Sequence, residues 1–336
     1  MSTTADVAPA VTDEEAVMAA DAFDRMAAAI ETAARCDPET VRLLLIAFAA
    51  GGHVLLEDLP GMGKTSLARA LAAVIGGTVR RVQCTPDLLP SDITGVTIFN
   101  QETREFEFHP GPVFANVVIV DEINRSTPKT QSALLEVMQE ERVTVDGTPH
   151  PVPTPFLVVA TQNPVEMEGT FPLPEAQLDR FLMRLSLGYP GEDAELSLMR
   201  AGAARPSPDD LAPVVKAAEA AAWLNDLADR VVFADRVYEY VLRLAQRTRR
   251  HAKLRAGVSI RASIALCRAA RMRAVADGRG HVTPDDVKAL ARPMWGHRLM
   301  ALSGAASAAE AAGLLDGVLA EVPAPGPHDG PYDGPR

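Results

Sequence analysis

The chain has 336 residues, which is too long for one ordinary domain and fits about two. Its hydrophobic content of 47% and charged content of 23% are ordinary for a globular protein with a core. No uncharged apolar run reaches the ~18 residues that cross a membrane, so we expect no membrane insertion. The start, MSTTADVAPAVTDEEAV, has no basic segment followed by an apolar segment, so we expect no signal peptide. Three scattered cysteines without metal-ligand spacing favour a reduced, cytoplasmic protein.

The net charge of −11 is unevenly distributed. Residues 1–190 carry 13 Lys and Arg against 26 Asp and Glu, whereas residues 191–320 carry 19 against 15. An acidic body counts against a protein that coats nucleic acid, because phosphate contacts dominate that affinity. The exception is the basic segment RLAQRTRRHAKLR (Arg243–Arg255), which we interpret first as a solvated helix face followed by a loop.

The predicted elements of the first half alternate between helices and strands. Apolar residues at helical spacing predict a helix over Val11–Ala34, and Asp37-Pro38 can begin a second helix that Gly51-Gly52 ends. A third helix is predicted over Ser66–Ile75. Short apolar runs predict five strands, at residues 53–58, 78–83, 117–122, 156–162 and 181–187. This alternation predicts an α/β domain with a parallel five-stranded sheet and helices on both faces.

The remaining segments predict an insertion, a second domain and two disordered ends. Ile93–Phe114 alternates apolar and polar residues around Asn100–Arg104, which predicts a β-hairpin inserted in the α/β body. From about residue 190 the strand signals stop, and the pattern is almost entirely helical to Leu319. We expect an α/β domain over residues 11–190, an all-helical domain over 191–320, and disorder in residues 1–10 and in the Pro/Gly-rich tail, 321–336.

A glycine-rich turn follows the first predicted strand and opens a helix. The segment is Pro60, Gly61, Met62, Gly63, Lys64, Thr65 and Ser66. Such a turn directs successive backbone N–H groups and the positive helix end at an anion, and we predict that the whole segment binds phosphate. Lys64 can reach the β- and γ-phosphates, and the Thr65 hydroxyl can ligate Mg²⁺. Asp58 stands where the generic pattern has glycine, a departure that we expect to matter little.

The third predicted strand, VVIVDE, ends in two carboxylates, Asp121 and Glu122. A carboxylate pair at the end of a buried strand is costly unless something uses it. Asp121 can hold Mg²⁺ through water, and Glu122 can polarise an attacking water. With the phosphate-binding segment, the pair predicts a site that hydrolyses ATP with Mg²⁺ as cofactor.

Three further residues are ambiguous when each is taken alone. Asn163 closes the fourth strand and can position water or touch the γ-phosphate, although Asn-Pro is also an ordinary turn. Arg180 can be a surface ion-pair partner of Asp179. Arg261 can be an arginine at a helix start.

Taken together, the motifs resemble the MoxR-type AAA+ ATPases. The similar segments are PGMGKT, QCTPDLLPSDITG, HPGPVFANVVIVDEINRSTPKTQSALLEVMQE, TQNPVEMEGTFPLPEAQLDRF, GVSIRAS and GRGHVTPDDVKALA, between about residues 20 and 300. The resemblance implies that Asn163 is the sensor-1 residue, Arg180 the arginine finger and Arg261 the sensor-2 arginine of the helical lid. It also implies that Ile93–Phe114 is the hairpin inserted in helix 2, with Phe106–Val113 lining a central pore.

The resemblance also implies how the chain works with other molecules. An arginine finger acts on a neighbouring subunit, so a homo-oligomeric, hexameric ring is expected. MoxR-like proteins resemble chaperones that mature partners, often ones with a von Willebrand factor A-type domain. Alternatives are a metal-inserting subunit of the magnesium-chelatase kind, a nucleic-acid motor, and a nucleotide-locked scaffold without turnover. The acidic body counts against the motor, and Glu122 and Arg180 count against the scaffold.

Overall fold

The computed structural model describes residues 9–34, 36–58, 62–163, 169–188, 192–201, 207–302, 304–305 and 307–326. The chain forms two compact units, one of residues 25–221 and one of residues 1–24 with 222–336. The structural division thus falls at 221/222, and the domain limits expected at 190/191 and 320/321 stay a prediction. Of the ends expected to be disordered, residues 1–8 and 327–336 lie outside the described residues.

The unit of residues 25–221 contains the predicted five-stranded parallel sheet. Its strands are β1 (Val54–Glu57), β2 (Val79–Gln83), β5 (Val117–Asp121), β8 (Leu157–Gln162) and β9 (Met183–Leu185), in the order β2-β5-β8-β1-β9. Every pair is parallel, so all five carboxyl ends lie along one edge of the sheet. That edge gathers the residues that follow β1, β2, β5 and β8, as ligand sites of such sheets require.

Helices and apolar side chains cover the sheet and hold its strands in place. All residues of β5 are buried, which is typical of a strand covered on both faces. Leu55, Val118 and Val158 share a core with Leu134 and Met138 of α5 (Pro128–Glu140). α3 (Lys64–Val74) lies against β5, and α2 (Pro38–Ala49) precedes β1. The Asp37 carboxylate accepts a hydrogen bond from Thr40 N at 3.1 Å, so the predicted helix cap is confirmed.

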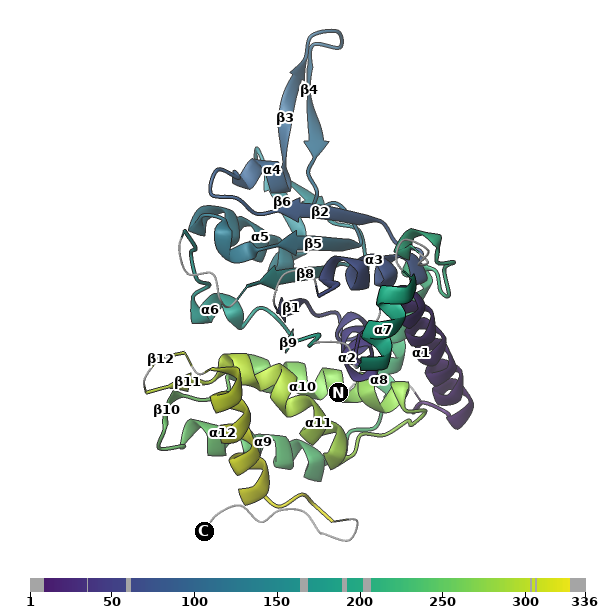
Figure 1. Cartoon of the computed structure of the whole chain (residues 1–336), viewed down its shortest axis with the longest axis vertical. Helices are drawn as coiled ribbons and strands as arrows, with labels where there is room; N and C mark the ends of the chain where they lie inside the picture. Colours follow the sequence, from purple (N-terminus) through teal and green to yellow (C-terminus); the bar gives the residue numbers. More distant parts are fainter. Residues whose placement is uncertain are drawn as a thin grey trace, which may run out of the picture. The chain divides into compact units, whose positions relative to one another are not determined.

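The inserted hairpin is present and extends away from the sheet (Figure 1). It follows α4 (Pro90–Thr94) and consists of β3 (Gly95–Asn100) and β4 (Glu105–Pro110). Phe106 is 74% exposed at the far end, whereas Val113 is fully buried in the core of the sheet. The expectation that Phe106–Val113 as a whole lines a pore is therefore wrong at Val113, because this end of the segment packs inside the subunit.

A second hairpin, which the sequence analysis did not predict, lies beside the first. It consists of β6 (Arg142–Val145) and β7 (Thr148–Pro151), after α5. The ring of His150 stacks on Phe108 of β4 with 4.1 Å between the ring centroids. The short elements that complete this unit are η1 (Ile123–Arg125), α6 (Glu175–Leu178), α7 (Glu192–Ala201) and η2 (Pro208–Asp210), and α8 (Ala217–Arg230) begins in it.

The other unit is helical, as expected, with one small sheet. Its helices are α9 (Asp235–Arg249), α10 (Ile260–Ala276), α11 (Pro284–Trp295), η3 (Gly296–Arg298) and α12 (Ala308–Glu321), together with most of α8 and the first half of α1 (Asp13–Ala33). Arg230 of α8 forms an ion pair with Glu15 of α1 at 2.7 Å. A three-stranded sheet of β10 (Leu254–Ala256), β11 (Met300–Ala301) and β12 (Gly304–Ala305) was not predicted.

Among the described helices, none is both long enough and apolar enough to cross a membrane.

Candidate nucleotide-binding site

The phosphate-binding segment leads directly into α3, as the sequence predicts. Gly63 is the N-cap residue of α3 with φ 86°, a left-handed conformation that glycine adopts without steric cost. Lys64, Thr65 and Ser66 form the first turn of the helix, where backbone N–H groups have no partner within the helix. This geometry suits an anion such as a phosphate. Pro60 and Gly61, which were predicted to contribute, lie outside the described residues.

The Lys64 ammonium lies inside the site and is held by the backbone. Its Nζ donates a hydrogen bond to the carbonyl oxygen of Asp58 at 2.6 Å. Burial lowers the pKa of Lys64, and the negative charges of Asp58, Asp121 and Glu122 oppose that shift. A bound phosphate would add negative charge beside Lys64 and favour its charged form further.

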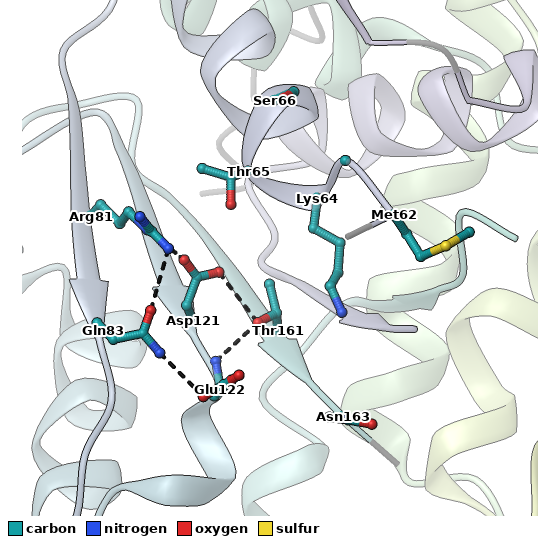
Figure 2. Close-up of a pocket in the computed structure, with 11 residues that line it drawn as sticks. Met62, Lys64, Thr65, Ser66, Arg81, Gln83, Asp121, Glu122, Thr161 and Asn163 are labelled. Atoms are coloured by element: carbon teal, nitrogen blue, oxygen red, sulfur yellow. Dashed lines mark hydrogen bonds and ion pairs between the residues drawn. The ribbon is translucent and has the colours of Figure 1, made fainter. Parts of the chain in front are cut away.

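Asp121, at the end of β5, is buried and already has a cationic partner. Arg81 of β2 donates from Nε to Asp121 Oδ2 at 2.6 Å, and Thr161 of β8 lies 3.4 Å from Oδ1 (Figure 2). The carboxylate is therefore compensated by neighbours on both adjacent strands. An Mg²⁺ ion that used Asp121 would have to share the carboxylate with the Arg81 guanidinium.

Glu122 follows Asp121 in a backbone conformation that is rare for a non-glycine residue, with φ 56° and ψ 51°. Its N–H donates to Thr161 Oγ1 at 2.9 Å, which helps to hold this conformation. Its Oε2 accepts from Gln83 Nε2 at 3.2 Å and from Arg125 at 3.0 Å. Strained backbone of this kind is concentrated at functional sites, where the surrounding contacts maintain it.

These groups line one cavity of about 360 Å³. Figure 2 shows the Lys64 and Asn163 side chains on one side of it and the linked Arg81, Gln83, Asp121 and Glu122 on the other. The lining residues are Met62, Gly63, Lys64, Thr65, Ser66, Arg81, Gln83, Asp121, Glu122, Thr161 and Asn163. The structure thus brings together the predicted residues from Met62 to Ser66 with Asp121, Glu122 and Asn163.

Two predicted residues lie elsewhere. Arg180 donates from one guanidinium nitrogen to the Leu135 carbonyl at 3.0 Å and to the Gln139 side chain, both on α5. It is not among the residues that line the nucleotide cavity. Arg261 is exposed in the first turn of α10, after the N-cap residue Ser259, and belongs to the other unit.

Arg81, Gln83 and Thr161 contact the predicted carboxylates but were missed in the sequence. A signal for them was present, because alternate residues of a strand share a face. Arg81 and Gln83 are two apart on β2, and Thr161 is two residues before Asn163. Their side chains therefore had to lie on one face of their strands, at the edge that carries the site.

The donors present fit a metal ion that is held mainly by a nucleotide. Among the described residues, no group of three or more His, Cys, Asp or Glu side chains could hold a metal by itself. Thr65 and Asp121 offer one hydroxyl and one carboxylate on the same cavity. Mg²⁺ is commonly bound in this way, by one or two protein oxygens with phosphates and water supplying the rest.

Comparison with known proteins decides the family. The model for the ATPase family associated with various cellular activities (AAA) matches residues 53–183, and the AAA lid domain model matches residues 246–315. Chaperone MoxR1 of Mycobacterium tuberculosis is 41% identical over 272 residues, covering 78% of this chain and 71% of that protein. The chain belongs to the MoxR-type AAA+ ATPases.

Other relatives agree with this assignment. The uncharacterized protein YeaC of Bacillus subtilis is 51% identical over 258 residues, covering 77% of this chain and 80% of that protein. The crystal structure of a candidate ATPase from Cytophaga hutchinsonii superposes with a TM-score of 0.83 at 36% identity, covering 94% of this chain and 98% of that one. As a member of the MoxR-type AAA+ family the chain is an enzyme that binds and hydrolyses ATP, with the predicted fold.

Proposed function

We propose that this MoxR-type ATPase works as a ring that uses Mg-dependent ATP hydrolysis to remodel or mature a partner protein. The observation that carries the proposal is the convergence of Lys64, Thr65, Asp121, Glu122 and Asn163 on one cavity. In the proposed assignment Lys64 and the N-terminus of α3 hold the phosphates, Thr65 and Asp121 hold Mg²⁺, and Glu122 polarises the attacking water. Asn163 positions that water or the γ-phosphate.

The ring is supported by the position of Arg180. This arginine follows α6, donates a hydrogen bond to Leu135 of α5 and does not line the cavity of its own subunit. As an arginine finger it would act on the nucleotide of a neighbouring subunit, where such a residue contributes roughly 10³–10⁵ in turnover. We propose a hexamer, as the resemblance implies, with Arg261 as the lid arginine that contacts the nucleotide.

The remodelling activity is supported by the hairpin β3–β4. It extends away from the sheet (Figure 1). Phe106 and Phe99 are exposed and pair near the turn of the hairpin, with 5.2 Å between their ring centroids. Exposed aromatic side chains on a projecting element mark a surface that contacts another protein. We propose that this end contacts the partner, and that the partner carries a von Willebrand factor A-type domain.

A trapping experiment tests the proposed function. Glu122→Gln should bind ATP without hydrolysing it and hold the partner during affinity purification, with Glu219→Gln on the exposed surface of α8 as control. A retained protein with a von Willebrand factor A-type domain would support the proposal. Retention of a metal-chelatase subunit or of nucleic acid would replace it by the corresponding alternative. Hydrolysis at the wild-type rate would contradict the role of Glu122.

A further inference from the structure

Asp58 stands at the first position of the phosphate-binding pattern, where glycine is usual, and its side chain accepts specific hydrogen bonds. The residue is only 8% exposed, so its carboxylate is removed from water. A buried carboxylate is costly unless hydrogen bonds compensate it. Because Asp58 is buried, its presence in place of glycine is not a neutral change at an exposed loop position.

The compensation comes from three consecutive residues that follow β9. Ser186 Oγ donates to Asp58 Oδ1 at 2.6 Å, Leu187 N donates to Oδ2 at 2.7 Å, and Gly188 N donates to Oδ1 at 3.3 Å. Consecutive N–H groups with a left-handed residue form an anion-binding concavity, and Gly188 has φ 61°. Both oxygens of the carboxylate are thus engaged by one short segment.

The backbone of the same residue holds the phosphate-binding lysine. The carbonyl oxygen of Asp58 accepts the Lys64 Nζ hydrogen bond at 2.6 Å. The side chain and the carbonyl of Asp58 therefore connect the segment after β9 with the ammonium that would meet the phosphates. An ion pair between Glu57 and Arg184, at 3.4 Å, joins β1 and β9 directly before this point.

We propose that Asp58 is a positioning residue for nucleotide binding, which anchors the chain directly after β1 to residues 186–188 and so places Lys64. The inference rests on the proposed function, because it concerns the same phosphate site. Asp58 does not touch the nucleotide in this account. It acts by limiting where its own carbonyl, and with it Lys64, can lie before the phosphates arrive.

The first test compares side chains at position 58 by the dissociation constant of ADP. Asp58→Asn places an amide N–H₂ against one of the three donors, and Asp58→Gly restores the generic pattern without an anchor. We expect both to weaken ADP binding at least about ten-fold, because hydrogen bonds to a charged group are lost. The rate of hydrolysis at saturating ATP should fall by a smaller factor than the affinity for ADP, since Asp58 does not act on the reacting atoms. Asp92→Asn removes a carboxylate that accepts from Leu89 N at 2.8 Å and does not line the cavity, so it should bind ADP like the wild type.

A second pair of variants decides the question if the Asp58 variants do not fold. Ser186→Ala removes one of the three hydrogen bonds, whereas Ser186→Thr keeps the hydroxyl on an exposed residue. We expect weaker ADP binding, by about three-fold, for Ser186→Ala only. Folded Asp58→Gly with the wild-type dissociation constant, or equal binding by the two Ser186 variants, would overturn the inference. If Glu122→Gln hydrolyses ATP while Asp58→Asn still weakens ADP binding, the proposed catalytic role fails and this inference stands.

Discussion

Gln83 of β2 donates a hydrogen bond from Nε2 to Oε2 of Glu122 at 3.2 Å (Figure 2). Arg125 donates to the same oxygen at 3.0 Å, and Arg81 bonds both Gln83, at 3.3 Å, and Asp121. The carboxylate proposed to polarise water is thus engaged by two protein donors. A water molecule that approaches Oε2 competes with these two donors for that oxygen.

Removal of the Gln83 amide should therefore raise the basal ATPase rate. We expect Gln83→Ala to hydrolyse ATP about two- to five-fold faster than the wild type, a small part of the 10²–10⁴ that a positioned base contributes. Steady-state phosphate release measures the effect, with Gln101→Ala in the turn of the β3–β4 hairpin as control. A slower Gln83→Ala enzyme would show that Gln83 supports Glu122 instead of restraining it.

Nucleotide affinity should fall at alkaline pH because of Lys64. Burial lowers the pKa of Lys64 in the folded protein from the ordinary 10.5. At pH values between the lowered pKa and 10.5, the unfolded chain therefore binds more protons than the folded chain. The nucleotide-free enzyme therefore gains stability from this group as pH rises through that interval. Bound phosphates favour the ammonium form, so nucleotide binding takes up a proton there and weakens as pH rises.

Titration of ADP between about pH 7 and pH 10 measures this dependence. The matched variant is Lys64→Arg, whose guanidinium stays protonated throughout and should flatten the alkaline decline in affinity. Lys64→Ala should lose most of the binding at every pH. An alkaline decline that is equally steep in Lys64→Arg would assign the effect to another group.

The end of α5 offers a gain in stability without a change at the site. Glu141 is exposed and has φ 50°, a left-handed conformation at the helix C-cap that favours glycine. Glu141→Gly should raise the free energy of unfolding by about 0.5–1 kcal/mol, because relief of strain exceeds the added chain entropy. Glu136→Gly, at an exposed position in the interior of α5, should lower it by a similar amount. Chemical denaturation of the two variants distinguishes them, and equal effects would contradict the argument.

The basic segment Arg243–Arg255 forms the end of α9 and the start of β10. Within it Arg249 donates to the Val258 carbonyl at 2.8 Å and Arg247 pairs with Glu321 of α12, so part of the segment holds its own unit together. Arg250→Glu with Lys253→Glu changes the charge of exposed positions and leaves those contacts in place. We expect this double variant to change ring assembly or the ATPase rate, and we expect no binding of nucleic acid by either the wild type or the variant. Salt-sensitive binding of DNA or RNA by the wild type, lost in this variant, would favour the motor.

The sequence predicted the parts of the site that depend on regular strands. Because the sheet is parallel, residues after different strands meet at one edge, and Lys64, Asp121 and Asn163 could be placed together before the structure. The contact partners Arg81 and Gln83 were missed. Side chains of β2 alternate between the two faces of the sheet, and this alternation places Arg81 and Gln83 on the same face.

Other features were missed for different physical reasons. The β6–β7 hairpin turns at Asp146-Gly147, an Asp-Gly pair with φ 50° and 79°, which is a strong signal for such a turn. β11 and β12 have two residues each, which is too few to show the alternation of apolar and polar residues that predicts a strand. The role of Asp58 depends on residues 186–188, more than 120 positions away, and local sequence carries no information on that contact.

The most direct test of a shared ATP site is a mixing experiment with two inactive variants. Lys64→Ala disables the phosphate site, and Arg180→Ala disables the proposed finger while the nucleotide cavity of its own subunit stays intact. If the finger acts on the neighbouring subunit, mixed rings contain some interfaces with both groups, and ATPase activity should return on mixing. Co-assembled subunits that remain inactive would contradict the account.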